Sequence, residues 1–273
     1  MMSVEPDADG LFDEVLDVAQ EDPNLALRVM HIANSAVSSP VSSIGTLETA
    51  VARLGAANVA DLVTAVSVAR VFVPRRKGEK ELWRHAVEVA TCCRAIIKRH
   101  HLEGVRPEHG YLAGLLHDIG RFVMFDQAPG FIQAVDDLGW RTPGELIEAE
   151  REVCGTDHAE LGARVCVHWA MPERVISIVK NHHRSIAELG SPLLAVLKQA
   201  DFLSVWLRSR TLSDNPAEAL GLAIPEDEMA SVPGAPRISA AELERLLPDV
   251  VGTSLRTAMA LGLVTQDRLR PAG

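Results

Sequence analysis

Imidazole and carboxylate side chains interrupt the apolar face of a helix predicted over residues 81–93. His85 lies three residues after Leu82 and four before Val89, so helical periodicity puts it on the face that these apolar residues bury. Glu81 lies one turn before His85 and is expected to point the same way. Charged forms of both groups need a partner if they are buried there.

Two further segments place ionisable residues where a core is expected. The sequence LLHDIG at 115–120 sets His117 and Asp118 inside an apolar segment. In the helix predicted over residues 192–207, Asp201 lies on the apolar stripe. A carboxylate at such a position is unusual, because aspartate is seldom buried without a partner.

These imidazoles and carboxylates limit the chemistry of the region when they are taken as a set. A single buried histidine is usually a core residue with satisfied hydrogen bonds. A buried collection must be paired internally, shifted to neutral forms or neutralised by a cation. Metal coordination satisfies all of them at once, and a mixed histidine and aspartate site suits Fe, Mn or Zn, as one ion or as two ions bridged by a carboxylate. The set consists of Glu81, His85, His117, Asp118 and Asp201.

The order of the histidine-containing segments resembles that of a known family. WRHAVEVA, LLHDIG, TDHAELG, NHHR and QAD follow one another along the chain. LLHDIG resembles the HD motif of the metal-dependent phosphohydrolase superfamily, and the whole order looks like the HDOD family, a relative of the HD-GYP cyclic-dinucleotide phosphodiesterases. EDPNLALRVMHIANSAVSSPVSSIGTLETAVARLG is similar to the opening of HDOD domains. The resemblance covers about residues 20–210 and implies an HD-domain-like helical bundle with signalling output.

Carried over residue by residue, the family pattern implies a set of metal ligands. Glu81 matches an additional carboxylate that some HD-GYP sites have one helical turn ahead of the first histidine. If the chain is an active enzyme, Asp118 and Arg121 are the catalytic candidates. The implied cofactor is a divalent transition metal, mononuclear or dinuclear. The implied ligands are Glu81, His85, His117, Asp118, His158, His182, His183 and Asp201.

Three of these histidines carry expectations of their own. Asp157 and Glu160 form a capping-box pattern that puts His158 in the first turn of a helix. The positive end of the helix dipole should disfavour the imidazolium there and keep the ring free to bind metal. Adjacent residues of a regular helix point in different directions, so at most one ring of His182 and His183 is expected at a common site.

Two departures from the HD-GYP pattern weigh against catalysis. Those enzymes have a lysine after HDxG, where this chain has Arg121. Arginine can stabilise a phosphate but is a poor proton donor, so a binding role could survive where an acid role would not. The GYP segment expected after the double histidine is replaced by Arg184-Ser-Ile-Ala. The remaining histidines match no ligand position and are interpreted as surface or packing residues: His31, His100, His101, His109 and His168.

Helical periodicity dominates the elements that must position these residues, and no stretch alternates like a strand. Asp22 before a proline predicts the start of a helix, and a short helix over 46–55 is followed by a longer one that opens at Asn58. One helix is expected after Ser239 and another over 250–262. The predicted fold class is therefore all-α.

Breaks in the pattern divide the chain into three predicted parts. Residues 1–76 form an N-terminal helical lobe, 77–210 an HD-type helical core with the metal-ligand candidates, and 211–273 a C-terminal helical extension. The basic run over 74–78 is interpreted as a solvated connector.

Composition and charge point away from nucleic acids and membranes. Of the 273 residues 47% are hydrophobic but only 4% aromatic, which suits close helix packing and offers few base-stacking platforms. The net charge of −10 repels phosphate backbones. The four cysteines lack CxxC spacing and are expected to pack as apolar groups in a reducing cytoplasm. Neither a signal peptide nor a membrane-spanning run is recognised, so the expected location is cytoplasmic.

Three functions compete on these grounds. The first is a bacterial-type regulatory module that binds metal, acts through a signalling protein partner and has little or no cyclic di-GMP phosphodiesterase activity. The second is an active metal-dependent phosphohydrolase that takes a nucleotide, a cyclic nucleotide or another phosphoester. The third is DNA binding through a helix-turn-helix over 46–71, but its second helix has few polar positions and resembles a core element. We favour the first.

Overall fold

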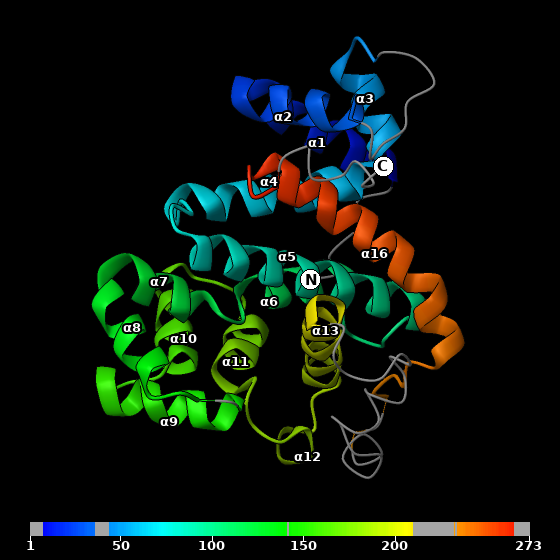
Figure 1. Cartoon of the computed structure of the whole chain (residues 1–273). Helices are drawn as coiled ribbons and strands as arrows, with labels where there is room; N and C mark the ends of the chain where they lie inside the picture. Colours follow the sequence, from blue (N-terminus) through cyan, green and yellow to red (C-terminus); the bar gives the residue numbers. More distant parts are fainter. Residues whose placement is uncertain (1–7, 36–43, 141, 210–231, 233, 265–273) are drawn as a thin grey trace, which may run out of the picture. The chain divides into compact units, whose positions relative to one another are not determined.

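The computed structural model of the chain describes residues 8–35, 44–140, 142–209, 232 and 234–264, and their regular structure is entirely helical (Figure 1). The predicted all-α class is confirmed. The helices are α1 (Ala8–Glu21), α2 (Pro23–Ala33), α3 (Leu47–Leu54), α4 (Ala56–Val71), α5 (Lys77–His100), α6 (Pro107–Leu116), α7 (Ile119–Gln127), α8 (Pro129–Asp137), α9 (Pro143–Cys154), α10 (His158–His168), α11 (Glu173–Asn181), α12 (Ile186–Leu189), α13 (Pro192–Ser209) and α16 (Ala240–Ala260).

Contacts divide the chain into two compact units. The first comprises Met1–Pro74 and Val251–Gly273, and the second comprises Arg75–Val250. The boundary after Pro74 lies close to the predicted end of the N-terminal lobe at residue 76. Much of the predicted C-terminal extension, residues 211–273, lies outside the described residues, and the described part is divided between the two units at Val250. Every candidate ligand of the metal site belongs to the second unit.

Local sequence signals define the helices of the first unit. The Asp22 carboxylate accepts hydrogen bonds from the backbone N–H groups of Asn24 at 3.0 Å and Leu25 at 3.3 Å, so it caps α2 as predicted. Gly55, with φ 84°, separates α3 from α4. Because this glycine makes the turn by itself, α4 begins directly after it and not at Asn58.

No single helix in the described part of the chain is long and apolar enough to cross a membrane. Helices α3 and α4 satisfy the length and hydropathy requirement only when they are taken together, and the pair is bent by 101°. Apolar side chains of both helices, Val51, Val59 and Leu62 among them, are buried in the core of the first unit.

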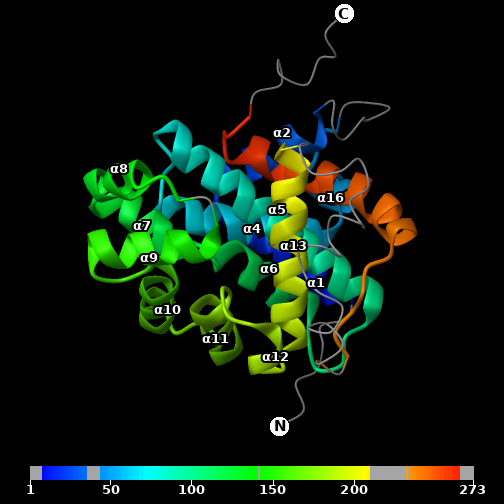
Figure 2. The same cartoon turned by 60° about the horizontal axis from the view of Figure 1, so that its bottom comes forward.

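The long helix α5 organises the second unit, and α6 and α13 pack against it (Figures 1 and 2). A β-carbon added to Gly114 of α6 would lie 2.7 Å from the Cα atom of Ala90 in α5, closer than real β-carbons come to another atom. The glycine therefore lets these helices touch backbone to backbone, which brings the end of α6 near the buried face of α5. Ile96, Leu194 and Leu197 are buried in the core that α5 shares with α13.

A second close approach joins α7 to α10. A β-carbon at Gly120 would lie 2.8 Å from the carbonyl carbon of His158 and 2.9 Å from the backbone nitrogen of Gly162. Only glycine fits this position of the HDIG segment without displacing backbone. The contact sets the start of α7, where Asp118 is found, beside the start of α10, where His158 is found.

The C-terminal helix differs from the prediction. One helix after Ser239 and a separate one over 250–262 were expected, but α16 runs without interruption through Pro248. Proline lacks the N–H that would continue the hydrogen-bond ladder, and this usually breaks a helix. Leu243 and Val250, on either side of the proline, are both buried in the core of the second unit, and this packing holds the helix together across it.

Candidate metal centre

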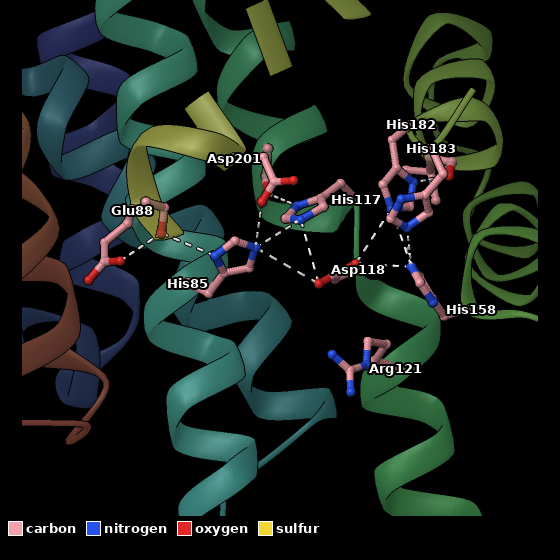
Figure 3. Close-up of polar contacts among 12 residues, drawn as sticks. His85, Glu88, His117, Asp118, Arg121, His158, His182, His183 and Asp201 are labelled. Atoms are coloured by element: carbon pink, nitrogen blue, oxygen red, sulfur yellow. Dashed lines mark hydrogen bonds and ion pairs between the residues drawn. The ribbon is translucent and has the colours of Figure 1, made fainter. Parts of the chain in front are cut away.

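The HD dipeptide lies at the junction between two helices. His117 is the C-cap of α6, and Asp118 is the N-cap of α7. The Asp118 side chain makes no capping hydrogen bond to α7. Its carboxylate therefore points away from its own helix, towards the surrounding histidines (Figure 3).

Two groups of side chains meet at this carboxylate, and each could hold a metal ion. We call Asp118, His158, His182 and His183 the His158 site, and His85, His117 and Asp118 the His85 site. Within each group the potential ligand atoms lie within 4.8 Å of one another. Asp201 borders the His85 site, because its Oδ1 is 3.1 Å from His85 Nε2. The cluster thus combines residues of α5, α10 and α13 with residues at the junction of α6 and α7 and at the end of α11 (Figure 3).

Asp118 presents a different oxygen to each site. Its Oδ1 is 3.3 Å from His158 Nε2 and 3.5 Å from His182 Nε2. Its Oδ2 is 3.6 Å from His117 Nε2 and 3.9 Å from His85 Nε2. The carboxylate therefore has the placement of a bridging group.

Backbone carbonyl groups fix the protonation of two of the rings. The Nδ1 atom of His117 is 2.7 Å from the oxygen of Gly114, and the Nδ1 atom of His182 is 2.7 Å from the oxygen of Val179. A carbonyl oxygen only accepts, so both Nδ1 atoms carry hydrogen and donate. In the neutral rings, Nε2 is then left with a lone pair directed into the cluster.

Side chains fix the rings of His158 and His85 in the same way. His158 Nδ1 donates to Glu150 Oε2 at 2.6 Å. His85 Nδ1 is 3.1 Å from Ser204 Oγ, and that hydroxyl donates to Glu88 Oε2 at 2.8 Å. Because the Ser204 hydrogen is used towards Glu88, its oxygen accepts from His85 Nδ1. Hydrogen bonding of the outer nitrogen is the usual way in which proteins orient a metal-binding histidine.

The Nε2 atoms, which point into the cluster, face one another at distances that require a hydrogen atom or a metal ion between them. His85 Nε2 is 3.2 Å from His117 Nε2, and His158 Nε2 is 3.3 Å from His182 Nε2 and 2.8 Å from His183 Nε2. Bare lone pairs repel at such distances, so a proton or a metal ion must lie between the rings. Imidazole and carboxylate are donors suited to Fe, Mn or Zn, and the donor set therefore fits the metal that the sequence implied.

Burial keeps two of the imidazoles neutral. It lowers the pKa of His117 to about 4, although Asp118 opposes the effect. Burial, together with the neighbouring His182 and His158, lowers the pKa of His183 to about 2. Both rings are therefore neutral at physiological pH, which is the form that binds metal.

His158 has the opposite behaviour. It begins α10 as predicted, and the Asp157 carboxylate caps that helix by accepting the Glu160 N–H at 2.9 Å. Burial alone would lower the pKa of His158, but hydrogen bonds to Asp118 and Glu150 outweigh it and raise this pKa to about 9. The expectation that His158 stays unprotonated is therefore wrong for the protein without metal, because the two carboxylates outweigh the helix dipole.

The two carboxylates of the cluster, Asp118 and Asp201, remain ionised. Burial would raise the pKa of Asp118, but His117 and hydrogen bonds with His158 and His182 bring it well below its usual value. Burial would also raise the pKa of Asp201, but the hydrogen bond with His85 lowers it to about 2. The Asp201 side chain is 37% exposed, so this edge of the cluster is accessible to solvent.

Two sequence predictions about the ligand set are corrected by the structure. Glu81 is not on the buried face, since its side chain is 55% exposed and its Oε1 lies 3.8 Å from Lys77 Nζ. His182 and His183 both reach His158, although only one of them was expected to. The reason is that α11 ends at Asn181, so the two histidines lie on the turn after the helix and not inside it.

The histidines that were assigned no ligand role lie outside both sites. His100 Nε2 is 3.5 Å from Glu242 Oε1, and the pKa of His109 is lowered mainly by burial. The others are exposed: His31, His101 and His168.

Three residues that support the rings were not predicted from the sequence. Glu150, which is fully buried, holds His158, while Ser204 and Glu88 hold His85. Glu150 could have been found, because it lies four residues after the buried Leu146 on the apolar face of α9. No sequence signal of this kind marks Ser204 and Glu88, because their contact forms only when α13 packs against α5.

Arg121 lies behind the His158 site. Its Nε is 3.8 Å from Glu150 Oε1, and its guanidinium carbon is 5.8 Å from the centre of the Trp140 ring. The Arg121 side chain is only 16% exposed. Its charge is thus directed towards a buried carboxylate.

Comparison with known proteins identifies relatives of this arrangement. The family model described as HDOD domain matches residues 2–185. A "Putative phosphohydrolase" from Shewanella amazonensis SB2B shares the fold at 23% identity and a TM-score of 0.68, over 94% of this chain and 95% of that one. An "HDOD domain protein with unknown function" from Geobacter sulfurreducens shares it at 22% identity and a TM-score of 0.67, over 94% and 88%.

A curated relative is longer than this chain. It is an "Uncharacterized protein" from Treponema pallidum (strain Nichols), 23% identical over 202 residues. The match covers 72% of this chain but only 39% of that protein, so the chain corresponds to much less than two thirds of its relative.

Proposed function

Because the chain belongs to the HDOD domain family, we propose that it is a bacterial-type signal-transduction protein whose His/Asp cluster holds divalent transition metal. It acts through a protein partner and has little or no cyclic di-GMP phosphodiesterase activity. The cytoplasm is its proposed compartment, and neither nucleic acid nor membrane is a proposed partner. A nucleotide or another phosphoester is the proposed class of small ligand.

The observation that carries the metal proposal is the shared carboxylate. Asp118 Oδ1 lies 3.3 Å from His158 Nε2, while Asp118 Oδ2 lies 3.6 Å from His117 Nε2. One ionised carboxylate between two sets of inward imidazole nitrogens suits two cations better than a hydrogen-bonded cluster. The residues that would hold them are those of the His158 site and the His85 site, with Asp201 beside the latter. Bound metal would supply a Lewis acid able to polarise a phosphate group.

Two features favour regulation over catalysis. The His158 site offers four protein ligands, as structural metal sites do, whereas catalytic sites usually keep one position open. Arg121, which Figure 3 shows beside the cluster, is already paired with Glu150, and its guanidinium carbon lies 5.8 Å from the centre of the Trp140 ring. It is therefore poorly placed to take over the acid role of the lysine in HD-GYP enzymes.

A panel of phosphodiester substrates tests this proposal. Protein purified without chelator and supplied with Mn, Fe or Zn is expected to leave cyclic di-GMP intact, and at most to hydrolyse a generic diester such as bis(p-nitrophenyl) phosphate slowly. Robust metal-dependent turnover of a cyclic dinucleotide would overturn it.

An active metal-dependent phosphohydrolase is the second candidate. Its support is the exposure of Asp201, which leaves the edge of the His85 site open to a ligand. If this candidate is right, Asp118→Ala abolishes the turnover seen with wild-type protein, because a hydrolase cannot lose the shared carboxylate and keep its metals. A regulatory module has no such turnover to lose.

A further inference from the structure

A buried ion pair lies directly behind the His158 site. Glu150 has no exposed side-chain surface, and Arg121 Nε is 3.8 Å from Glu150 Oε1. Neither of these two atoms has a hydrogen-bond partner in the described part of the chain. The pair is therefore held by charge and packing, and removing one member leaves the other charge buried.

The other oxygen of Glu150 is used entirely by His158. Glu150 Oε2 accepts from the His158 backbone N–H at 2.8 Å and from its Nδ1 at 2.6 Å. The carboxylate fixes both the first residue of α10 and the orientation of its ring. His158 Nε2 is consequently turned towards Asp118 Oδ1, at 3.3 Å.

We propose that Glu150 and Arg121 are positioning residues that set the metal affinity of the His158 site in opposite directions. This inference rests on the proposed function, in that it requires metal at that site. Glu150 orients the ring and adds a negative charge one hydrogen bond from the ligand, which strengthens cation binding. Arg121 places a positive charge against the same carboxylate, and this charge weakens cation binding at the site. The arginine after HDIG thus tunes a metal site and does not serve as a phosphate-binding group.

The His85 site gives an internal contrast. The outer nitrogen of His85 rests on the neutral hydroxyl of Ser204, and the charged Glu88 is one hydrogen bond further away. Of these two histidines, His158 is the one whose outer nitrogen, Nδ1, contacts a carboxylate, and that carboxylate in turn lies against a cation. Changes at Glu150 and Arg121 should therefore act on one of the two metals.

Two variants that each remove one charge test the proposal, because they should change the zinc affinity in opposite directions. The zinc affinities of the Glu150→Gln and Arg121→Met variants of the 273-residue chain are measured by competition with a chromophoric chelator. Glu148→Gln, which changes an exposed residue of the same helix, is the control. Glu150→Gln, which keeps an acceptor for His158, is expected to bind one zinc roughly tenfold more weakly. Arg121→Met is expected to bind that zinc roughly threefold or more tightly. Glu148→Gln should match wild type.

A purely structural role for the pair predicts something different. Both variants would then lower zinc affinity together through loss of fold, or both would leave it unchanged, and either result would overturn the proposal. If the Glu150→Gln variant fails to fold, the zinc affinities of Arg121→Met and Arg121→Lys test the proposal instead. Tighter binding by the first and wild-type binding by the second support the proposal, and equal or weaker binding by Arg121→Met overturns it. Wild-type protein that takes up no zinc would overturn the proposed function as well, whereas zinc-binding wild type with unresponsive variants overturns only this inference.

Discussion

Gly120 and His158 are in backbone contact, since a β-carbon at position 120 would lie 2.8 Å from the carbonyl carbon of His158. This contact explains why a glycine follows the HD dipeptide at this spacing. It fixes the distance between Asp118 at the start of α7 and the His158 ring at the start of α10. The geometry of the candidate metal centre therefore depends on Gly120, which has no side chain.

Gly120→Ala is expected to lower the free energy of unfolding by about 1–3 kcal/mol or more, because the new methyl group forces α7 away from α10. Thermal or urea denaturation measures the change. Gly130→Ala is the matched control, since a β-carbon there meets no atom within 4 Å. Equal stability of the two variants would contradict the backbone contact.

Chelation should lower the melting temperature of the wild-type protein, because metal bound only to the folded state stabilises it. At a free metal concentration 100 times the Kd, one site contributes about 2.7 kcal/mol. His117→Ala removes the buried ligand of the His85 site and should show a smaller chelator effect. His168→Ala, which changes an exposed histidine, should respond like wild type. Identical melting curves with and without chelator would indicate a purely hydrogen-bonded cluster.

The stability of the metal-free protein should pass through a maximum near pH 6.5. Burial lowers the pKa of His117 from 6.5 to about 4, so the unfolded chain binds the additional proton and stability rises with pH between these values. The pKa of His158 is raised from 6.5 to about 9, so stability present below pH 6.5 is lost as the pH rises through about 9. Denaturation at fixed ionic strength measures the profile.

Zinc-saturated protein provides the control for that profile. Metal at His158 Nε2 replaces the proton there, so the falling limb between pH 6.5 and about 9 should disappear. A metal-free profile that keeps rising through pH 9 would show that Asp118 and Glu150 do not stabilise a charged His158.

Residue types and periodicity were enough to predict the helical class and the core of the site. His85, His117, Asp118 and Asp201 each interrupt an apolar stripe, and the structure brings them together. A buried polar residue on a helix face is visible in a sequence because the period of the helix assigns it to that face. The wrong expectation for Glu81 shows the limit, since this residue one turn before His85 is exposed and lies beside Lys77.

Contacts between distant helices were not predictable in this way. Glu150 supports His158 only because the end of α9 comes close to the start of α10, and Ser204 meets Glu88 only because α13 packs against α5. The joint approach of His182 and His183 depends on where α11 ends. Helix ends and tertiary packing decide these features, and local sequence signals report both poorly.

The metal content of the purified protein tests the central claim most directly. Elemental analysis of wild-type protein prepared without chelator and titrated with Mn, Fe and Zn should find about two ions per chain, by the count and type of ligands. Asp118→Ala, which lacks the carboxylate common to the His158 site and the His85 site, should retain far less of both. Wild-type protein that stays metal-free through all three titrations would contradict the account.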